Sequence, residues 1–215
     1  IISDNQHLLR VDEESTTNLN AEVELSFTNH ILSLVNQHSV NAIVFEDYDK
    51  GAITPELIHR VVELANNKGI PTLVDPKKRN FAAYHGVTLF KPNYKELIEG
   101  LKLDVQKNDF NGIFEAAKTI HNSMQVRLVF ITLSELGVFI SNGESYSAIP
   151  AQMREIADVS GAGDTVISTA SLCLAAGLSS DDIATIANMA GGLVCEKVGV
   201  VPIEKELLLQ ECLNF

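Results

Sequence analysis

The sequence predicts an α/β protein with a mostly parallel sheet and helices on both of its faces. Short apolar runs alternate with longer amphipathic stretches through residue 132, which is the pattern of successive βαβ units. Helical stretches rich in Ala and Leu close the chain and suit packing against such a sheet. No repeat, low-complexity tract or linker interrupts this order, so residues 1–215 are expected to form a single domain.

The individual elements follow from apolar runs, helix caps and turn residues. Short apolar runs predict strands at residues 8–11, 42–46, 71–74, 87–90 and 128–132. Amphipathic stretches predict helices at residues 55–68, from near 93, at 110–123, 161–174, 180–196 and 204–213. Thr54 is expected to cap the first of these helices, and Gly69 lies just past its end. Residues 138–141 and 146–149 flank Asn142-Gly143, a pair suited to a hairpin turn.

Composition excludes several classes of protein. The chain has 16 Lys and Arg against 28 Asp and Glu, a formal net charge of −12. Nucleic acids and anionic membranes require clustered basic residues, although an acidic protein can still hold a locally positive pocket. No apolar run is long enough for a membrane span, and residues 1–10 do not resemble a signal peptide. The cysteines, Cys173, Cys195 and Cys212, are widely spaced and favour free thiols. We therefore expect a cytoplasmic protein that binds neither nucleic acid nor membrane.

The strongest local signal for a functional site is the stretch DVSGAGDT at residues 158–165, which precedes an apolar helical run. Glycines at a helix start let backbone N–H groups approach an anion, and the helix dipole favours negative charge there. Asp164, in the first turn, would be placed to take a proton from a hydroxyl that attacks this anion. Phosphoryl transfer needs both parts. Equally, the stretch is a glycine-rich turn in which Asp164 only complements the dipole.

The DxxGAGD pattern resembles the C-terminal signature of the ribokinase-like (PfkB) carbohydrate kinases, and the resemblance covers nearly the whole chain. It implies a ribokinase-like three-layer α/β/α sandwich and a sugar kinase that uses ATP and Mg²⁺. Asp164 is then the catalytic base, and Gly161, Ala162 and Gly163 supply the amides of an anion hole. Ser160 stands where many members of the family have Thr, a mild departure.

The same resemblance implies a set of nucleotide-binding residues, which are Asn93, Tyr94, Lys95, Glu96, Thr132, Ser134, Glu135, Gly137 and Asn188. Asn93 and Glu96 form an Asn-x-x-Glu element that places the ATP phosphates, with Glu96 reaching the magnesium shell through water. This spacing is also that of a helix capping box, and both interpretations can hold together. Residues 132–137 resemble a nucleotide-binding turn that follows a late strand. Asn188 would lie near the adenine, although a lone helical Asn is otherwise usually solvated.

Three further segments indicate the substrate. Residues 46–51 (EDYDKG), 73–77 (LVDPK) and 88–93 (TLFKPN) are similar to bacterial D-glycero-β-D-manno-heptose 7-phosphate kinases, the kinase module of ADP-heptose synthases. Those enzymes phosphorylate an anomeric hydroxyl on the way to lipopolysaccharide. The resemblance thus implies a sugar phosphate and ATP as the small-molecule partners.

Four charged residues at predicted strand ends suit these anionic ligands. Lys50 and Lys77 lie at the expected rim of the ligand crevice and suit a sugar phosphate or the ATP phosphates. Asp47 and Asp75, at the same rim, would order these lysines or magnesium-bound waters. Alternatively, the two lysines are only solvated surface residues, and the two aspartates only end their strands.

Members of the family begin with a strand and glycine-rich segments that bind the sugar and build a small β-lid, often a dimer interface. None of these precedes Ile1 in this sequence, so we expect the C-terminal part of a kinase domain, and a homodimer formed through the lid segment. Two other functions stay open at this point. One is another sugar or nucleoside kinase on the same scaffold, and the other is a non-catalytic nucleotide-binding subunit.

Overall fold

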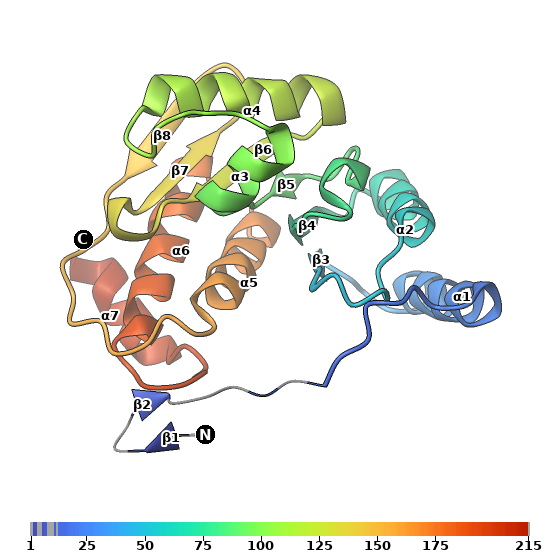
Figure 1. Ribbon diagram of the computed structural model, residues 1–215, viewed down its shortest axis with the longest axis horizontal. Helices are drawn as coiled ribbons and strands as arrows, with labels where there is room; N and C mark the ends of the chain where they lie inside the picture. Colours follow the sequence, from blue (N-terminus) through green and yellow to red (C-terminus); the bar gives the residue numbers. More distant parts are fainter. Residues whose placement is uncertain (1, 4–5, 8–10, 12, 215) are drawn as a thin grey trace.

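The computed structural model describes residues 2–3, 6–7, 11 and 13–214 (Figure 1). Its strands are β1 (Ile2–Ser3), β2 (Gln6–His7), β3 (Ile43–Glu46), β4 (Thr72–Asp75), β5 (Leu89–Phe90), β6 (Leu128–Thr132), β7 (Val138–Ser141) and β8 (Tyr146–Ile149). Its α-helices are α1 (Ala21–Gln37), α2 (Pro55–Lys68), α3 (Tyr94–Leu101), α4 (Phe110–Met124), α5 (Ala162–Ala175), α6 (Ser180–Cys195) and α7 (Lys205–Asn214). Short 3₁₀ turns are η1 (Phe81–Ala83) and η2 (Ser134–Leu136).

The main sheet has six strands in the order β3-β4-β5-β6-β7-β8, and β1 pairs separately with β2. Strands β3 to β6 run parallel, whereas β7 and β8 add an antiparallel hairpin at one side. The carboxyl ends of parallel strands meet at one edge of a sheet, so Glu46, Asp75 and Thr132 all lie toward the same edge. The predicted mostly parallel α/β fold is confirmed.

Helices cover both faces of this sheet, as alternating side chains along the strands require. Val74 and Phe90 point into the core under α2, α3 and α4, while Leu73 and Leu89 point into the core under α5 and α6. Figure 1 shows the two groups of helices on opposite sides of the sheet, with α7 beside α6 and α1 beside α2. The architecture is therefore a three-layer α/β/α sandwich.

Local caps fix several element ends where the sequence predicts them. The Thr54 hydroxyl accepts a hydrogen bond from Leu57 N at 3.2 Å, and Gly69 ends α2 at φ +67°. Asn93 and Glu96 form a capping box at the start of α3. The hairpin of β7 and β8 has the predicted bounds.

The structure differs from the expected elements at four places. Strand β4 is displaced by one residue from the predicted 71–74, and β5 is two residues shorter than 87–90. Helix α1 was not predicted at all. Of the strand expected at residues 8–11, residues 8–10 lie outside the described residues, and Val11 belongs to no strand.

Helix α1 escapes prediction because its apolar side chains do not follow one stripe. Thr28 and Val35 are its buried residues, while Val23, Leu25 and Phe27 are exposed. The start signal is nevertheless present, since the Asn20 side chain accepts a hydrogen bond from Val23 N at 2.9 Å. The capping signal alone, followed by an irregular apolar pattern, was not enough to predict this 17-residue helix.

The described helices include none with the length and apolar character needed to cross a membrane. All three cysteines are free, as predicted, with Cys173 and Cys195 buried. Desolvation by burial raises the pKa of each thiol.

Candidate functional site

The candidate site is built around the first turn of α5, which meets the carboxyl edge of the sheet. Gly161 is the N-cap at φ +79°, a conformation that favours glycine, and Ala162, Gly163 and Asp164 form the first helical turn. A Cβ atom on Gly163 would lie 3.6 Å from Asp75 Oδ2 and 3.8 Å from Lys91 Nζ. The helix start that the sequence predicts as an anion site therefore lies against charged side chains of the sheet edge.

These side chains form a charged cluster, defined here as Glu46, Asp75, Lys77, Lys91 and Asp164. Asp75 lies at its centre, with Oδ2 2.9 Å from Lys91 Nζ and Oδ1 3.2 Å from Lys77 Nζ. The Lys91 side chain is only 2% exposed, so its ammonium depends on Asp75 for compensation. The Lys77 ammonium also lies 2.5 Å from Glu96 Oε1, which links the cluster to the start of α3.

The carboxylates of the cluster are crowded. Glu46, Asp75 and Asp164 each offer an oxygen within 4.8 Å of the others, near enough to surround one cation. Burial of Glu46, followed by the nearby charges of Asp75 and Asp164, raises its pKa to about 7, and Lys91 and Lys77 oppose that rise. Glu46 therefore changes its protonation near neutral pH.

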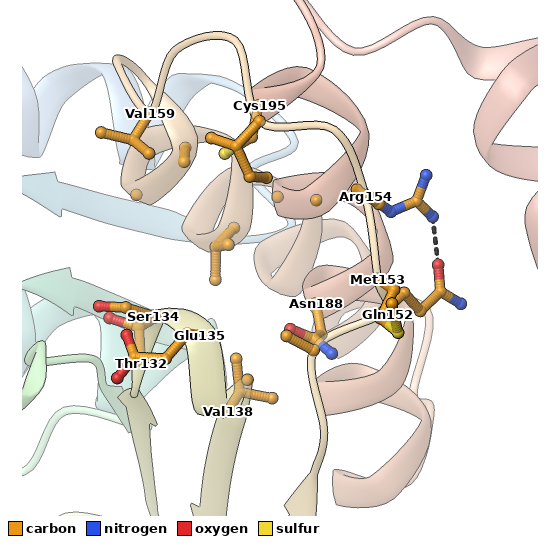
Figure 2. A pocket seen from close by; sticks show the side chains of 18 residues that line it. Thr132, Ser134, Glu135, Val138, Gln152, Met153, Arg154, Val159, Asn188 and Cys195 are labelled. Atoms are coloured by element: carbon orange, nitrogen blue, oxygen red, sulfur yellow. Dashed lines mark hydrogen bonds between the residues drawn. The ribbon is translucent and has the colours of Figure 1, made fainter.

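A cavity of about 640 Å³ opens beside the start of α5, where Ala162 and Gly163 line it (Figure 2). The predicted residues that line it are Thr132, Ser134, Glu135, Gly137, Ala162, Gly163 and Asn188. Apolar side chains complete the wall, including Val138, Met153, Ile156, Val159 and Val166. This size and mixed lining are typical of small-molecule sites.

Backbone contacts explain why distant parts of the sequence meet at this cavity. Asn93 bridges to Thr132 in parallel register, so the Asn-x-x-Glu element and the turn after β6 are direct neighbours. Gly137 has φ +87°, and a Cβ there would lie 2.1 Å from Ile149 O, so the turn requires glycine. Asn188 donates to Pro150 O at 2.9 Å, and Figure 2 shows its side chain beside the segment that carries Gln152 and Met153.

Some predicted nucleotide-binding residues are engaged elsewhere. The Lys95 side chain is 83% exposed and lies 3.8 Å from Glu99, and the Tyr94 hydroxyl donates to Val105 O. Neither residue lines the cavity, so their nucleotide contacts stay predictions. Glu96 accepts from its N-cap amide as well as from Lys77, so a contact with magnesium would have to pass through water or displace one of them.

Asp47 and Lys50 have protein partners of their own. Asp47 is buried and accepts hydrogen bonds from Asn80 Nδ2 at 2.9 Å, Tyr84 OH at 2.7 Å and Asp49 N at 2.9 Å. Burial and the hydrogen bond to Asp47 raise the pKa of Tyr84. Lys50 is half exposed and pairs with Glu14. The substrate contacts predicted for both residues remain predictions.

Several site residues escaped the sequence analysis. Lys91 lies just after the end of β5, as Lys77 lies just after the end of β4. This position at the carboxyl end of a parallel strand was the signal that could have predicted Lys91 as a site residue. Arg154 carried no such signal: its guanidinium contacts Glu196 Oε1 at 2.6 Å, Glu211 Oε2 at 2.9 Å and the Gln152 side chain. Figure 2 shows the contact with Gln152 at the cavity wall. Arg154 thereby ties the segment that borders the cavity to the residue that caps α6 and to α7.

A glycine-rich helix start that lies beside both a cavity and a charged cluster, at the carboxyl edge of a mostly parallel sheet, has the parts that phosphoryl transfer requires. Residues 7–206 match the model of the family described as "pfkB family carbohydrate kinase", and the chain belongs to this family.

Relatives and solved structures agree with this assignment. The bifunctional protein HldE of Methylobacillus flagellatus is 36% identical over 211 residues, which are 98% of this chain and 43% of that protein. HldE of Magnetococcus marinus is 36% identical over 206 residues, 95% of this chain and 42% of that protein. The chain thus spans less than half the length of these relatives.

Two solved kinases have the same fold. Phosphofructokinase-2 from Escherichia coli, in complex with potassium, has a TM-score of 0.78 at 21% identity, over 90% of this chain and 62% of that one. Ribokinase from Arabidopsis thaliana, complexed with ribose and ATP, has a TM-score of 0.72 at 17% identity, over 88% of this chain and 59% of that one. These similarities confirm the predicted ribokinase-like fold.

Proposed function

We propose that the protein is an ATP-dependent kinase that phosphorylates the anomeric hydroxyl of D-glycero-β-D-manno-heptose 7-phosphate. The product would be the 1,7-bisphosphate, an intermediate toward ADP-heptose and lipopolysaccharide core. The family membership supports the reaction class, and the similarity to HldE proteins supports the heptose. Such an enzyme would work in the cytoplasm, where ATP is available.

The observation that carries this proposal is the position of Asp164 in the first turn of α5, inside the charged cluster and directly after Gly163, which lines the cavity. In the proposed reaction Asp164 takes the proton of the sugar hydroxyl, whose oxygen forms a bond to the γ-phosphorus of ATP. The bond between that phosphorus and the β–γ bridging oxygen breaks, and ADP leaves. The amides of Gly161, Ala162 and Gly163 stabilise the charge on the transferring group.

The cavity is the proposed nucleotide site. Thr132 and Gly137 would border the nucleotide on one side and Asn188 on the other, with the phosphates directed toward the helix start. Magnesium would neutralise phosphate charge, with Glu96 reaching its shell through water. Lys77 lies near that path because it contacts both Asp75 and Glu96.

On the acceptor side, Lys50 is exposed enough to meet a sugar phosphate, in exchange for its contact with Glu14. Asp47 and Asp75 would act by ordering the residues around the site, because their carboxylates already hold protein donors. A homodimer formed through a lid, implied by the family resemblance, belongs to the same proposal.

The test is steady-state turnover of the full-length protein with heptose 7-phosphate, beside ribose and fructose 6-phosphate. Asp164→Asn should lower kcat by about 10²–10⁴-fold, because a positioned general base contributes that much, with ATP affinity nearly unchanged. Asp104→Asn, at an exposed aspartate, is the matched control and should have no effect. Full turnover in Asp164→Asn would show that Asp164 is not the general base. Turnover with a different sugar would reassign the substrate, and ATP binding without any turnover would favour a nucleotide-binding subunit.

A further inference from the structure

The turn that follows β3, residues 46–51 (EDYDKG), reaches the candidate base directly through Tyr48. The Tyr48 hydroxyl donates a hydrogen bond to Asp164 Oδ2 at 3.1 Å, across 116 positions of the sequence. Nothing in the roles proposed above uses this contact. It connects a segment singled out by its sequence to the residue on which the chemistry depends.

The turn is built in a way that fixes Tyr48 in place. Asp47, directly before it, is held by Asn80, Tyr84 and the amide of Asp49, so one side of Tyr48 is anchored in the protein interior. On the other side Asp49 adopts φ +57°, a left-handed conformation that turns the chain.

The turn ends at Gly51, which is also fixed. Gly51 lies at φ +81° with its Cα against the backbone of Thr17, where a Cβ would come within 2.1 Å of Thr17 O. The Gly51 carbonyl accepts a hydrogen bond from Leu19 N at 3.1 Å. Backbone anchored on both sides of a residue restricts where that residue can place its side chain.

Tyr48 gains little from packing. Its side chain is 54% exposed, so burial of the ring does not account for its position. Partial desolvation of the hydroxyl, then the hydrogen bond to Asp164 and that residue's charge, raise the pKa of Tyr48 to about 12. The phenol therefore keeps its proton at physiological pH and stays a donor.

Asp164 needs such a donor because of its other neighbours. Glu46 at the end of β3 and Asp75 at the end of β4 place carboxylate oxygens within 4.8 Å of its own. Like charges at this distance repel and would turn the Asp164 side chain away from the sheet edge. A neutral hydroxyl that donates to one oxygen opposes that movement without adding charge where an anionic group must arrive.

We infer that Tyr48 is a positioning residue of the phosphoryl transfer: its hydroxyl holds Asp164 through Oδ2 and leaves Oδ1 to take the proton of the acceptor hydroxyl. This inference rests on the proposed role of Asp164 as the base. It also gives the EDYDKG turn a function, in which Asp47 and Gly51 fix the backbone and Tyr48 makes the contact.

The kinetic test is a double-mutant cycle in the full-length protein with heptose 7-phosphate and ATP. Tyr48→Phe should lower kcat about 10-fold, the effect expected for one hydrogen bond to a charged group, while KM for ATP stays unchanged. In the Asp164→Asn background the same substitution should change kcat less than about twofold, because the residue that it positions is gone. Tyr146→Phe, at another partly exposed tyrosine whose hydroxyl contacts Asn111, is the matched control and should be silent.

A residue that only stabilised the fold would behave differently: Tyr48→Phe would lower the melting temperature and leave kcat unchanged. Equal losses of kcat in the parent and Asp164→Asn backgrounds would also overturn the inference, since Tyr48 would then act independently of Asp164.

A second measurement needs no sugar and separates this inference from the choice of substrate. In protein labelled with ¹³C at tyrosine Cζ, the Tyr48 resonance, assigned with Tyr48→Phe, should move in Asp164→Asn and stay in place in Asp104→Asn. If the Tyr48 resonance does not move in Asp164→Asn, the hydrogen bond between Tyr48 and Asp164 does not form and the inference is wrong. If the resonance moves but heptose 7-phosphate is not turned over, the contact stands, the proposed sugar fails, and the kinetic cycle is run with the sugar that is turned over.

Discussion

Replacement of Glu46 by Gln should make the protein more stable at alkaline pH and leave its stability unchanged at acidic pH. Glu46 ends β3 in a half-buried position, beside the carboxylates of Asp75 and Asp164. Its burial and these charges raise its pKa from 4.5 to about 7. Gln has nearly the shape of protonated Glu and cannot ionise, so it removes this effect alone.

The direction follows from proton linkage. The folded state binds the Glu46 proton more tightly than the unfolded state, so this carboxyl stabilises the fold below pH 4.5 and loses that contribution as the pH rises through about 7. A shift from 4.5 to about 7 corresponds to about 3 kcal/mol at about 1.4 kcal/mol per pKa unit. Solvent screening at this partly exposed group reduces the expected value to about 2 kcal/mol.

The assay is urea unfolding of parent and Glu46→Gln at pH 4.5 and pH 8, in EDTA so that no cation occupies the cluster. We expect Glu46→Gln to raise the free energy of unfolding by about 2 kcal/mol at pH 8 and by almost nothing at pH 4.5. Glu63→Gln, on the exposed face of α2, is the control and should give no pH-dependent difference. An equal effect of Glu46→Gln at both pH values, or destabilisation at pH 8, would refute the reasoning.

Two further predictions concern packing and charge around the site. Lys91→Met should lower the free energy of unfolding by about 3 kcal/mol, because Lys77 is then the one cation that the charged cluster keeps beside the buried carboxylate of Asp75. In urea unfolding, the double variant Lys91→Met with Asp75→Asn should regain most of the lost free energy of unfolding. A double variant no more stable than Lys91→Met alone would contradict the argument from charge. Gly191→Ala should cost about 1–3 kcal/mol, since its Cβ would lie 2.6 Å from Val166 Cγ2 between α5 and α6. Thermal unfolding measures this effect, and an unchanged melting temperature would mean that the two helices separate freely.

The sequence predicts elements best where local chemistry decides their ends. Thr54 and Gly69 bound α2 as expected, and the Asn142-Gly143 turn lies between β7 and β8. Local signals do not predict an element where contacts between distant segments determine its bounds or its existence. Strand β5 keeps only Leu89 and Phe90 because these two residues pair with both neighbouring strands. Helix α1 is set by packing against α2, which its irregular apolar pattern did not reveal.

The same distinction holds for the site. The motif around Asp164 and the rule for parallel strand ends predict which segments gather at the sheet edge, and the structure brings them there. They do not predict individual contacts such as that of Tyr48, which depends on how the turn after β3 is anchored by Asn80 and Tyr84. Arg154 is a similar case, because its acidic partners Glu196 and Glu211 lie 42 and 57 positions later in the chain.

The net charge of −12 does not by itself exclude anionic ligands, because lysines can still lie at the site where such a ligand would bind. Lys77 and Lys91 both contact Asp75, beside the start of α5. With Glu46 protonated, these two lysines balance Asp75 and Asp164, and with Glu46 ionised the charged cluster carries one net negative charge. In the proposed reaction an arriving phosphoryl group would therefore meet less repulsion when Glu46 is neutral. That group would also compete with Asp75 and Glu96 for the ammonium of Lys77, the less buried of the two lysines. In the proposed kinase, Lys91 would then stay paired with Asp75, and Lys77 would be the lysine that exchanges a carboxylate for a phosphate.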